Sequence, residues 1–102
     1  MALSSKDRAA LRAEAHRLTA AVHVGQHGLS DSVRQTIDDA LRTRELVKIA
    51  ISKNADADAK EIANQVATAL GADVVQVIGK TATMYRENPE LERKSGVPPW
   101  RR

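Results

Sequence analysis

The sequence predicts a small α/β domain in which one four-stranded mixed sheet is packed by helices. Its 102 residues match the length of one domain. Three segments carry apolar residues at helical spacing, and the segments between them contain short runs of apolar residues that are typical of strands. The predicted order is α-β-α-β-α-β-β. Strands separated by helices need crossovers and are expected to run parallel, whereas the last two strands form a hairpin.

Three helices are predicted from apolar stripes with capping residues at their ends. We expect the first helix to begin at Ser4 or Ser5 and the second at Ser30 or Asp31, because short oxygen-bearing side chains accept from free helix N–H groups. Gly71 is placed to stop the third helix. The three stripes are Leu11, Ala15 and Leu18; Val33, Ile37, Ala40 and Leu41; and Ile62, Val66 and Leu70.

Four strands are predicted at residues 20–24, 45–51, 74–78 and 82–85. The second of them is apolar on both faces, with only Lys48 reaching out, which indicates the interior of a sheet. Gly79 and Lys80 suit the tight turn of the final hairpin.

The charge of the chain is unevenly distributed. The net charge of +3 and the isoelectric point of about 9.6 point weakly to a polyanionic partner. Residues 1–54 and 80–102 each carry a balance of +3, and residues 55–79 carry −3. This partition predicts a basic and an acidic side, although ordinary scatter in a short chain would also produce it. On the second helix, Asp38 is spaced to pair with Arg34 or Arg42.

Several classes of function are disfavoured. No cysteine is present, so disulfides and thiolate chemistry are excluded. The N-terminal segment has no apolar signal core and no stretch is long enough to span a membrane, so we expect a cytoplasmic protein. His23 and His27 are four residues apart but divided by a glycine, so no metal site is expected. Gly79-Lys80-Thr81 lacks the preceding glycine of a phosphate-binding P-loop. We therefore expect no catalysis and no cofactor.

The strongest functional signal is the loop Gly25-Gln26-His27-Gly28 between a strand and a helix. Glycines let a phosphate approach backbone N–H groups, and the helix dipole attracts anions. Such a GxxG loop clamps the nucleic-acid backbone in KH-type modules. The alternative for the two glycines is a turn that only requires a positive φ. The alternative for the basic residues around the loop is that they are ordinary solvated surface charges. Tyr85 is expected in the core rather than stacked on a base. The predicted basic rim of the loop comprises Arg8, Arg12, Arg42, Arg44, Lys48 and Lys80.

Three ordered blocks of the sequence resemble one known family. They are Ala15-His16-Arg17-Leu18 with Val24-Gly25-Gln26-His27-Gly28-Leu29-Ser30; Arg44-Glu45-Leu46-Val47-Lys48-Ile49; and Gly71-Ala72 with Val75-Gln76-Val77-Ile78-Gly79-Lys80 and Met84-Tyr85-Arg86. This pattern resembles the CRM domain (chloroplast RNA splicing and ribosome maturation) in its stand-alone bacterial YhbY form, over about residues 3–86. Here Gln26 and His27 occupy the middle of the loop, where many relatives carry a basic or small polar pair.

The resemblance implies a fold similar to the C-terminal domain of bacterial translation initiation factor 3, and RNA binding without catalysis. It implies association with ribosomal RNA in precursors of the large ribosomal subunit, with residues Gly25 to Gly28 at the contact. We expect a monomer composed of an RNA-binding domain over residues 1–86 and a flexible charged tail over residues 87–102, which includes Trp100. The alternative function is a module that docks on a ribosomal or translation-associated protein.

Overall fold

The computed structural model describes residues 4–55 and 57–88, and their helices and strands follow the predicted order. No helix in these ranges is long and apolar enough to cross a membrane. The elements are α1 (Ser5–Ala15), β1 (Val22–Val24), α2 (Asp31–Arg44), β2 (Leu46–Ile51), α3 (Ala59–Leu70), β3 (Asp73–Ile78) and β4 (Thr81–Tyr85).

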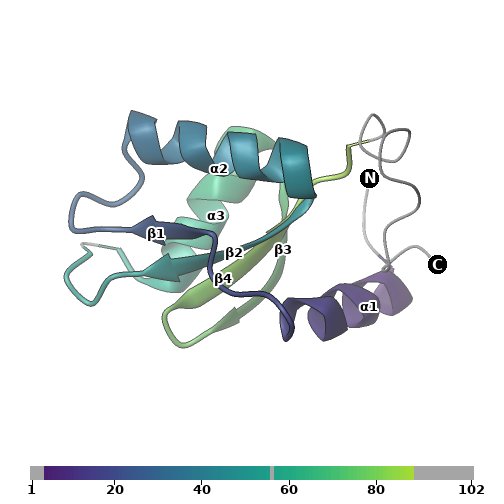
Figure 1. Ribbon diagram of the computed structural model, residues 1–102. Coiled ribbons are helices and arrows are strands. Elements are labelled where there is room, and N and C mark those ends of the chain that lie inside the picture. Colours follow the sequence, from purple (N-terminus) through teal and green to yellow (C-terminus); the bar gives the residue numbers. More distant parts are fainter. Residues whose placement is uncertain (1–3, 56, 89–102) are drawn as a thin grey trace.

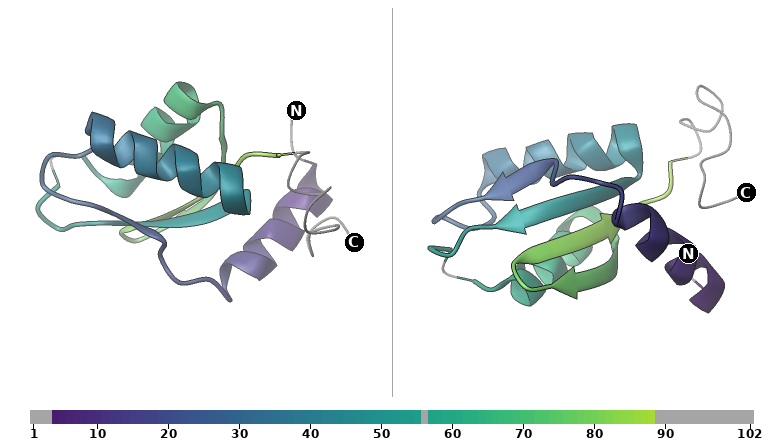
Figure 2. Two further views of the ribbon diagram at one scale, coloured as in Figure 1. Left: turned by 45° about the horizontal axis from the view of Figure 1, so that its top comes forward. Right: turned by 60° about the horizontal axis from the view of Figure 1, so that its bottom comes forward.

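The four strands form one mixed sheet, as the sequence predicts, and their pairing places them in the order β1-β2-β4-β3. β1 runs parallel to β2, and β4 is antiparallel to both of its neighbours, β2 and β3. Helices α2 and α3 lie on one face of the sheet, and α1 lies on the other near one end (Figure 1). The two tilted views in Figure 2 show that α1 leaves much of its face uncovered.

Each face of the sheet has its own apolar cluster. Val47, Ile49 and Ile51 alternate along β2 and are buried in the larger cluster, which also contains residues of α2 and α3. The smaller cluster beneath α1 comprises Leu11, Leu46, Val75 and Tyr85, with Leu18 packed against it. Period-two alternation therefore places both faces of β2 in apolar surroundings. Tyr85 is 6% exposed, so it packs in the core as predicted.

The predicted helix ends agree with the observed caps. The Ser4 hydroxyl accepts from the Asp7 N–H at 3.1 Å, and the Asp7 carboxylate accepts in return from the Ser4 N–H, which completes a capping box. The Ser30 hydroxyl accepts from the Val33 N–H at 3.3 Å. Gly71 ends α3 in the left-handed region with φ +64°. Ser4, Ser30 and Gly71 therefore set three of the six helix ends.

Several predicted boundaries were wrong. β1 begins at Val22 rather than at residue 20, and β3 and β4 each begin one residue earlier than predicted, at Asp73 and Thr81. The helical stripe was expected to reach Leu18, but α1 ends at Ala15, and Leu18 reaches the apolar cluster from the segment that follows. Strand β2 begins at Leu46 rather than Glu45, because Glu45 is the C-cap of α2 with φ +62°. A residue with positive φ cannot extend a β ladder, so the strand starts one residue later.

The predicted pairing of Asp38 was also wrong. Its carboxylate accepts from Arg86, which comes directly after β4, at 2.7 Å. Arg34 pairs instead with Asp31, and Arg42 with Asp39, each three residues earlier on α2. Both arginines have an acidic neighbour on the exposed side of the helix, which leaves Asp38, 30% exposed at its side chain, for a partner from the segment after β4.

The predicted tail lies mostly outside the described residues. Glu87 and Asn88 are described, and the Asn88 N–H donates to the Glu45 carboxylate at 2.6 Å. The backbone N–H of Arg86 donates to the Glu45 carbonyl at 3.0 Å. The chain is thus held against the end of α2 up to residue 88. Residues 89–102, with Trp100, lie outside the described ranges.

Candidate functional site

The loop Gly25–Gly28 joins β1 to α2 and forms an open, tight turn. The N–H of Gly28 donates to the Gly25 carbonyl at 3.0 Å, and the N–H of Ser30 donates to the Gly28 carbonyl at 3.0 Å. Gly25, Gln26 and His27 are exposed, and Gly28 is half-buried. The loop is therefore accessible to a ligand, and two backbone hydrogen bonds fix its conformation.

The two glycines of the loop have different physical roles. Gly28 has φ +66°, which side chains rarely tolerate, and a Cβ there would lie 3.9 Å from Ile62 Cδ1 of α3. Gly25 has no atom within 4 Å of such a Cβ and no positive φ. The turn itself therefore requires Gly28, whereas a glycine at position 25 only keeps the surface open.

Free backbone donors gather at the loop and the first turn of α2. Within the described ranges, six N–H groups of the loop and the first turn of α2 donate no hydrogen bond, because the cap of Ser30 reaches only Val33 and the closure of the turn uses only Gly28 and Ser30. Free N–H groups at a helix start attract anions, and the helix dipole adds to that attraction. The six groups belong to Gly25, Gln26, His27, Leu29, Asp31 and Ser32.

Three turns meet at the end of the sheet where β1 and β2 finish and β4 begins. We call this end, which carries the loop, the loop edge. The N–H of Ser52 donates to the Val24 carbonyl at 2.8 Å, which brings the turn after β2 beside Gly25. The N–H of Ile51 donates to the Lys80 carbonyl at 2.7 Å, which brings the hairpin to the same edge. Lys53 and Lys80 are both exposed there. Lys53 was not among the predicted rim residues, although the predicted parallel pairing of β1 and β2 implies that both strands finish at the same end of the sheet.

Two residues of the predicted basic rim lie far from the loop. Arg42 and Arg44 occupy the last turn of α2, and the loop precedes its first turn. A helix of this length measures about 20 Å. Arg42 is also paired with Asp39 on the helix surface. The structure therefore places these arginines at the opposite end of the domain from Gly25–Gly28.

Three other predicted rim residues belong to α1 or contact it. Arg8 donates through Nη1 to the Val74 carbonyl of edge strand β3 at 2.7 Å. Lys48 donates through Nζ to the carbonyls of Ala15 and Leu18, at 3.3 and 3.4 Å, and so ties the end of α1 to the sheet. Arg12 is exposed. Of the predicted rim, Lys80 alone shares the edge of the loop.

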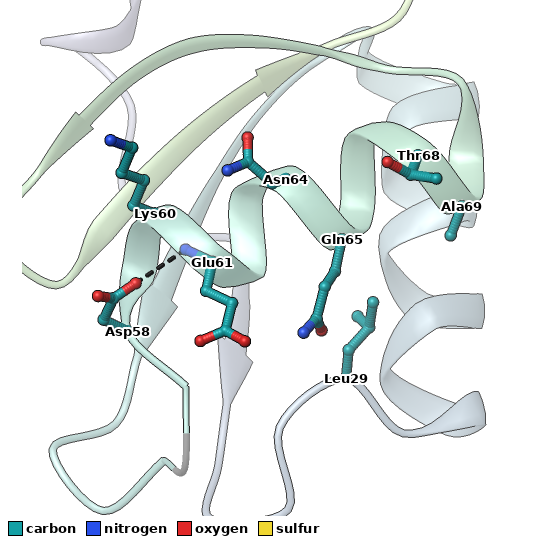
Figure 3. Close-up of a pocket in the computed structure, with 8 residues that line it drawn as sticks. All are labelled: Leu29, Asp58, Lys60, Glu61, Asn64, Gln65, Thr68 and Ala69. Carbon is teal, nitrogen blue, oxygen red and sulfur yellow. Dashed lines mark hydrogen bonds between the residues drawn. The ribbon is translucent and has the colours of Figure 1, made fainter.

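A wide groove of about 750 Å³ runs along α3 on the other side of the loop. In Figure 3 Leu29, which follows the loop, points toward α3 beside Gln65, and Asp58 and Glu61 lie at the start of the helix. The Asp58 carboxylate accepts from the Glu61 N–H at 2.8 Å as the cap of α3. The groove carries two carboxylates and Lys60, so the loop separates a lysine-bearing edge from an acidic groove.

The histidines do not form a metal site. His23 lies on the sheet face that carries α1, His27 lies in the loop, and His16 follows α1. Within residues 4–55 and 57–88, no group of three or more His, Cys, Asp or Glu residues is arranged to hold a metal ion.

The sheet, the helix arrangement and the exposed glycine loop define a class of small α/β domain, and comparison with known proteins identifies the family. The model of the CRS1/YhbY (CRM) domain matches residues 3–86. The chain belongs to this CRM domain family, as the sequence motifs predict.

Named relatives agree with this assignment. The chain is 34% identical to the probable RNA-binding protein YqeI of Bacillus subtilis, over 86% of this chain and 92% of the relative. It is 35% identical to an RNA-binding protein of Haemophilus influenzae, over 88% and 91% of the two chains. The solution structure of a Staphylococcus aureus protein, for which RNA binding has been suggested, matches with a TM-score of 0.73 and 34% identity, over 85% and 91%.

Proposed function

We propose that this protein binds RNA and that the loop Gly25–Gly28 captures RNA phosphates. The observation that carries the proposal is the set of free N–H groups that the open loop and the first turn of α2 present together. Membership of a family whose relatives are named RNA-binding proteins supports the same conclusion. We propose no catalytic activity for this protein.

In the proposed complex, one phosphate lies against the loop and accepts from N–H groups such as those of His27 and Leu29. Lys53 and Lys80 attract the neighbouring phosphates along the same edge. Backbone contacts position RNA without reading its sequence, so recognition depends mainly on RNA shape. The carboxylates of the groove along α3 repel phosphate, and the RNA backbone therefore runs on the lysine side of the loop.

We further propose that the RNA is ribosomal RNA in precursors of the large ribosomal subunit, whose assembly the protein assists in the cytoplasm. The resemblance of the three sequence blocks to the bacterial YhbY form supports this role. Crosslinking the protein to RNA in cells tests it, because the mapped sites should concentrate in precursor large-subunit RNA. Sites spread over messenger RNA would contradict the proposal.

The loop contact is tested with Gly25→Asp. A side chain at position 25 meets no neighbouring atom, so the variant should fold normally while placing a carboxylate where phosphate is expected. Affinity for a fragment of large-subunit ribosomal RNA at fixed salt should fall by about tenfold or more, which equals about 1.4 kcal/mol. Ala9→Glu adds the same charge on the exposed side of α1 and serves as the matched control. Equal affinities for both variants would refute the loop contact.

The acidic groove favours a second candidate function, the docking of a basic protein segment. Its two carboxylates and neutral amides lie on the exposed surface of α3 (Figure 3). Co-sedimentation with large-subunit particles after ribonuclease treatment separates the two candidates. Loss of co-sedimentation indicates an RNA contact, and its persistence indicates a protein contact.

A further inference from the structure

The sheet face that carries α1 is covered over only part of its length. At one end, Leu46 and its register partner Tyr85 are buried under α1 together with Leu11. The next two rows of register partners continue along the same face toward the loop edge. These rows are Lys48–Thr83–Gln76, and His23–Ala50–Thr81–Ile78. Ile78 is 60% exposed, which is unusual for a large apolar side chain.

A small pocket of about 120 Å³ opens in these two rows. It is lined by His16, Lys48, Gln76, Ile78, Thr81 and Thr83. Thr83 is only 1% exposed, yet its hydroxyl makes no hydrogen bond with any described residue. The Thr83 hydroxyl is not fully enclosed, so it reaches the pocket and can bond a ligand group there.

The chemistry of the pocket matches a sugar better than a phosphate or a base. Of its two basic residues, His16 and Lys48, the lysine has two of its three donors already used by the carbonyls at the end of α1. Hydroxyl and amide groups both donate and accept, as a sugar hydroxyl does. The volume corresponds to about four water molecules, at about 30 Å³ each, which is small for a base with its sugar.

We propose that this pocket binds a ribose of the RNA and recognises its 2′-hydroxyl through Thr83 and Gln76, with Ile78 against the sugar ring. The inference rests on the proposed RNA binding at Gly25–Gly28. The pocket is continuous with that edge, because Thr81 follows Lys80 directly. Two strand spacings separate β1 from β4, or about 10 Å. A single RNA strand can therefore contact the loop and the pocket together. The 2′-hydroxyl is the group by which a protein distinguishes RNA from DNA.

Thr83→Val tests the pocket because it removes the hydroxyl, keeps the side-chain shape and breaks no hydrogen bond of the described protein. Binding is measured at fixed salt to a short single-stranded RNA of mixed sequence and to the DNA of the same sequence. We expect the wild-type protein to prefer RNA, and Thr83→Val to lose about fivefold or more of its RNA affinity with little change for DNA. Thr68→Val, an exposed substitution on α3, is the matched control.

Gln76→Leu provides a second variant, should Thr83→Val fail to fold. An unchanged ratio of RNA to DNA affinity in the folded variants would overturn the proposal, as would equal wild-type affinities for both strands. Equal losses for RNA and DNA would show a phosphate contact and overturn it too. Gly25→Asp should weaken both strands alike, because both carry phosphates. Failure of the loop contact and failure of the ribose pocket are therefore distinguishable.

Discussion

Arg86 holds Asp38 of α2 through Nη1 at 2.7 Å, and the same nitrogen donates to the carbonyl of Leu70 at the end of α3 at 3.0 Å. Nη2 donates to the backbone carbonyl of Asp38 at 3.2 Å. One guanidinium at the end of β4 thus joins the two helices that cover the larger apolar cluster. The Arg86 side chain is 24% exposed. If this side chain is removed, water can therefore replace its hydrogen bonds only in part.

Arg86→Ala should lower the free energy of unfolding by about 2 kcal/mol, because it leaves a half-buried carboxylate and a helix carbonyl without their charged donor. Urea denaturation measures the change. Arg34→Ala removes the exposed pair with Asp31 and should cost less than about 1 kcal/mol. Equal losses in the two variants would show that the Arg86 contacts contribute no more than a surface ion pair.

Glu45 should tolerate glycine better than alanine. Its φ of +62° costs an L-residue about 1–2 kcal/mol, and glycine escapes that cost. Both substitutions remove the carboxylate that accepts from the Asn88 N–H. Glu45→Gly should therefore be more stable than Glu45→Ala by about 1 kcal/mol in urea denaturation, the reverse of the order expected inside a helix. The usual order would indicate that backbone strain at residue 45 is negligible.

The two loop glycines should differ in stability when each is changed to alanine. Gly28→Ala should cost about 1 kcal/mol or more because of the positive φ, whereas Gly25→Ala should stay within about 0.5 kcal/mol of the wild type. Thermal or urea unfolding provides both values. A large loss at position 25 would mean that the loop is more tightly enclosed than its exposure indicates.

The lysines at the loop edge should dominate the salt dependence of RNA binding. Each phosphate contact that is removed should reduce the slope of log affinity against log salt by about 1. The double variant Lys53→Ala/Lys80→Ala should therefore lose about 2 units of slope. Arg42→Ala/Arg44→Ala removes the same charge about 20 Å away and should lose less than about 1 unit. A larger loss for the arginine pair would place the RNA at the other end of α2.

Much of the fold is predictable because local signals agree with one another. The stripes of α2 and α3, the caps Ser30 and Gly71 and the alternation along β2 all depend on residues close in the chain. The site is predictable in the same way up to its loop, since glycine spacing and a helix start can be read locally. The partners of Asp38 and Lys48 are not predictable from local signals. The partner of Asp38 lies 48 residues away along the chain, and those of Lys48 lie 30 or more residues away.

The order of helices and strands, the family membership and the position of the glycine loop follow from the amino-acid sequence, since periodicity, caps and motifs are properties of neighbouring residues. Which basic residues share an edge with the loop was decided by the packed sheet. Strand pairing brought Lys53 and Lys80 to Gly25, left Arg42 and Arg44 at the far end of α2, and engaged Lys48 at α1. Such relationships arise from long-range register and packing, which no local pattern encodes.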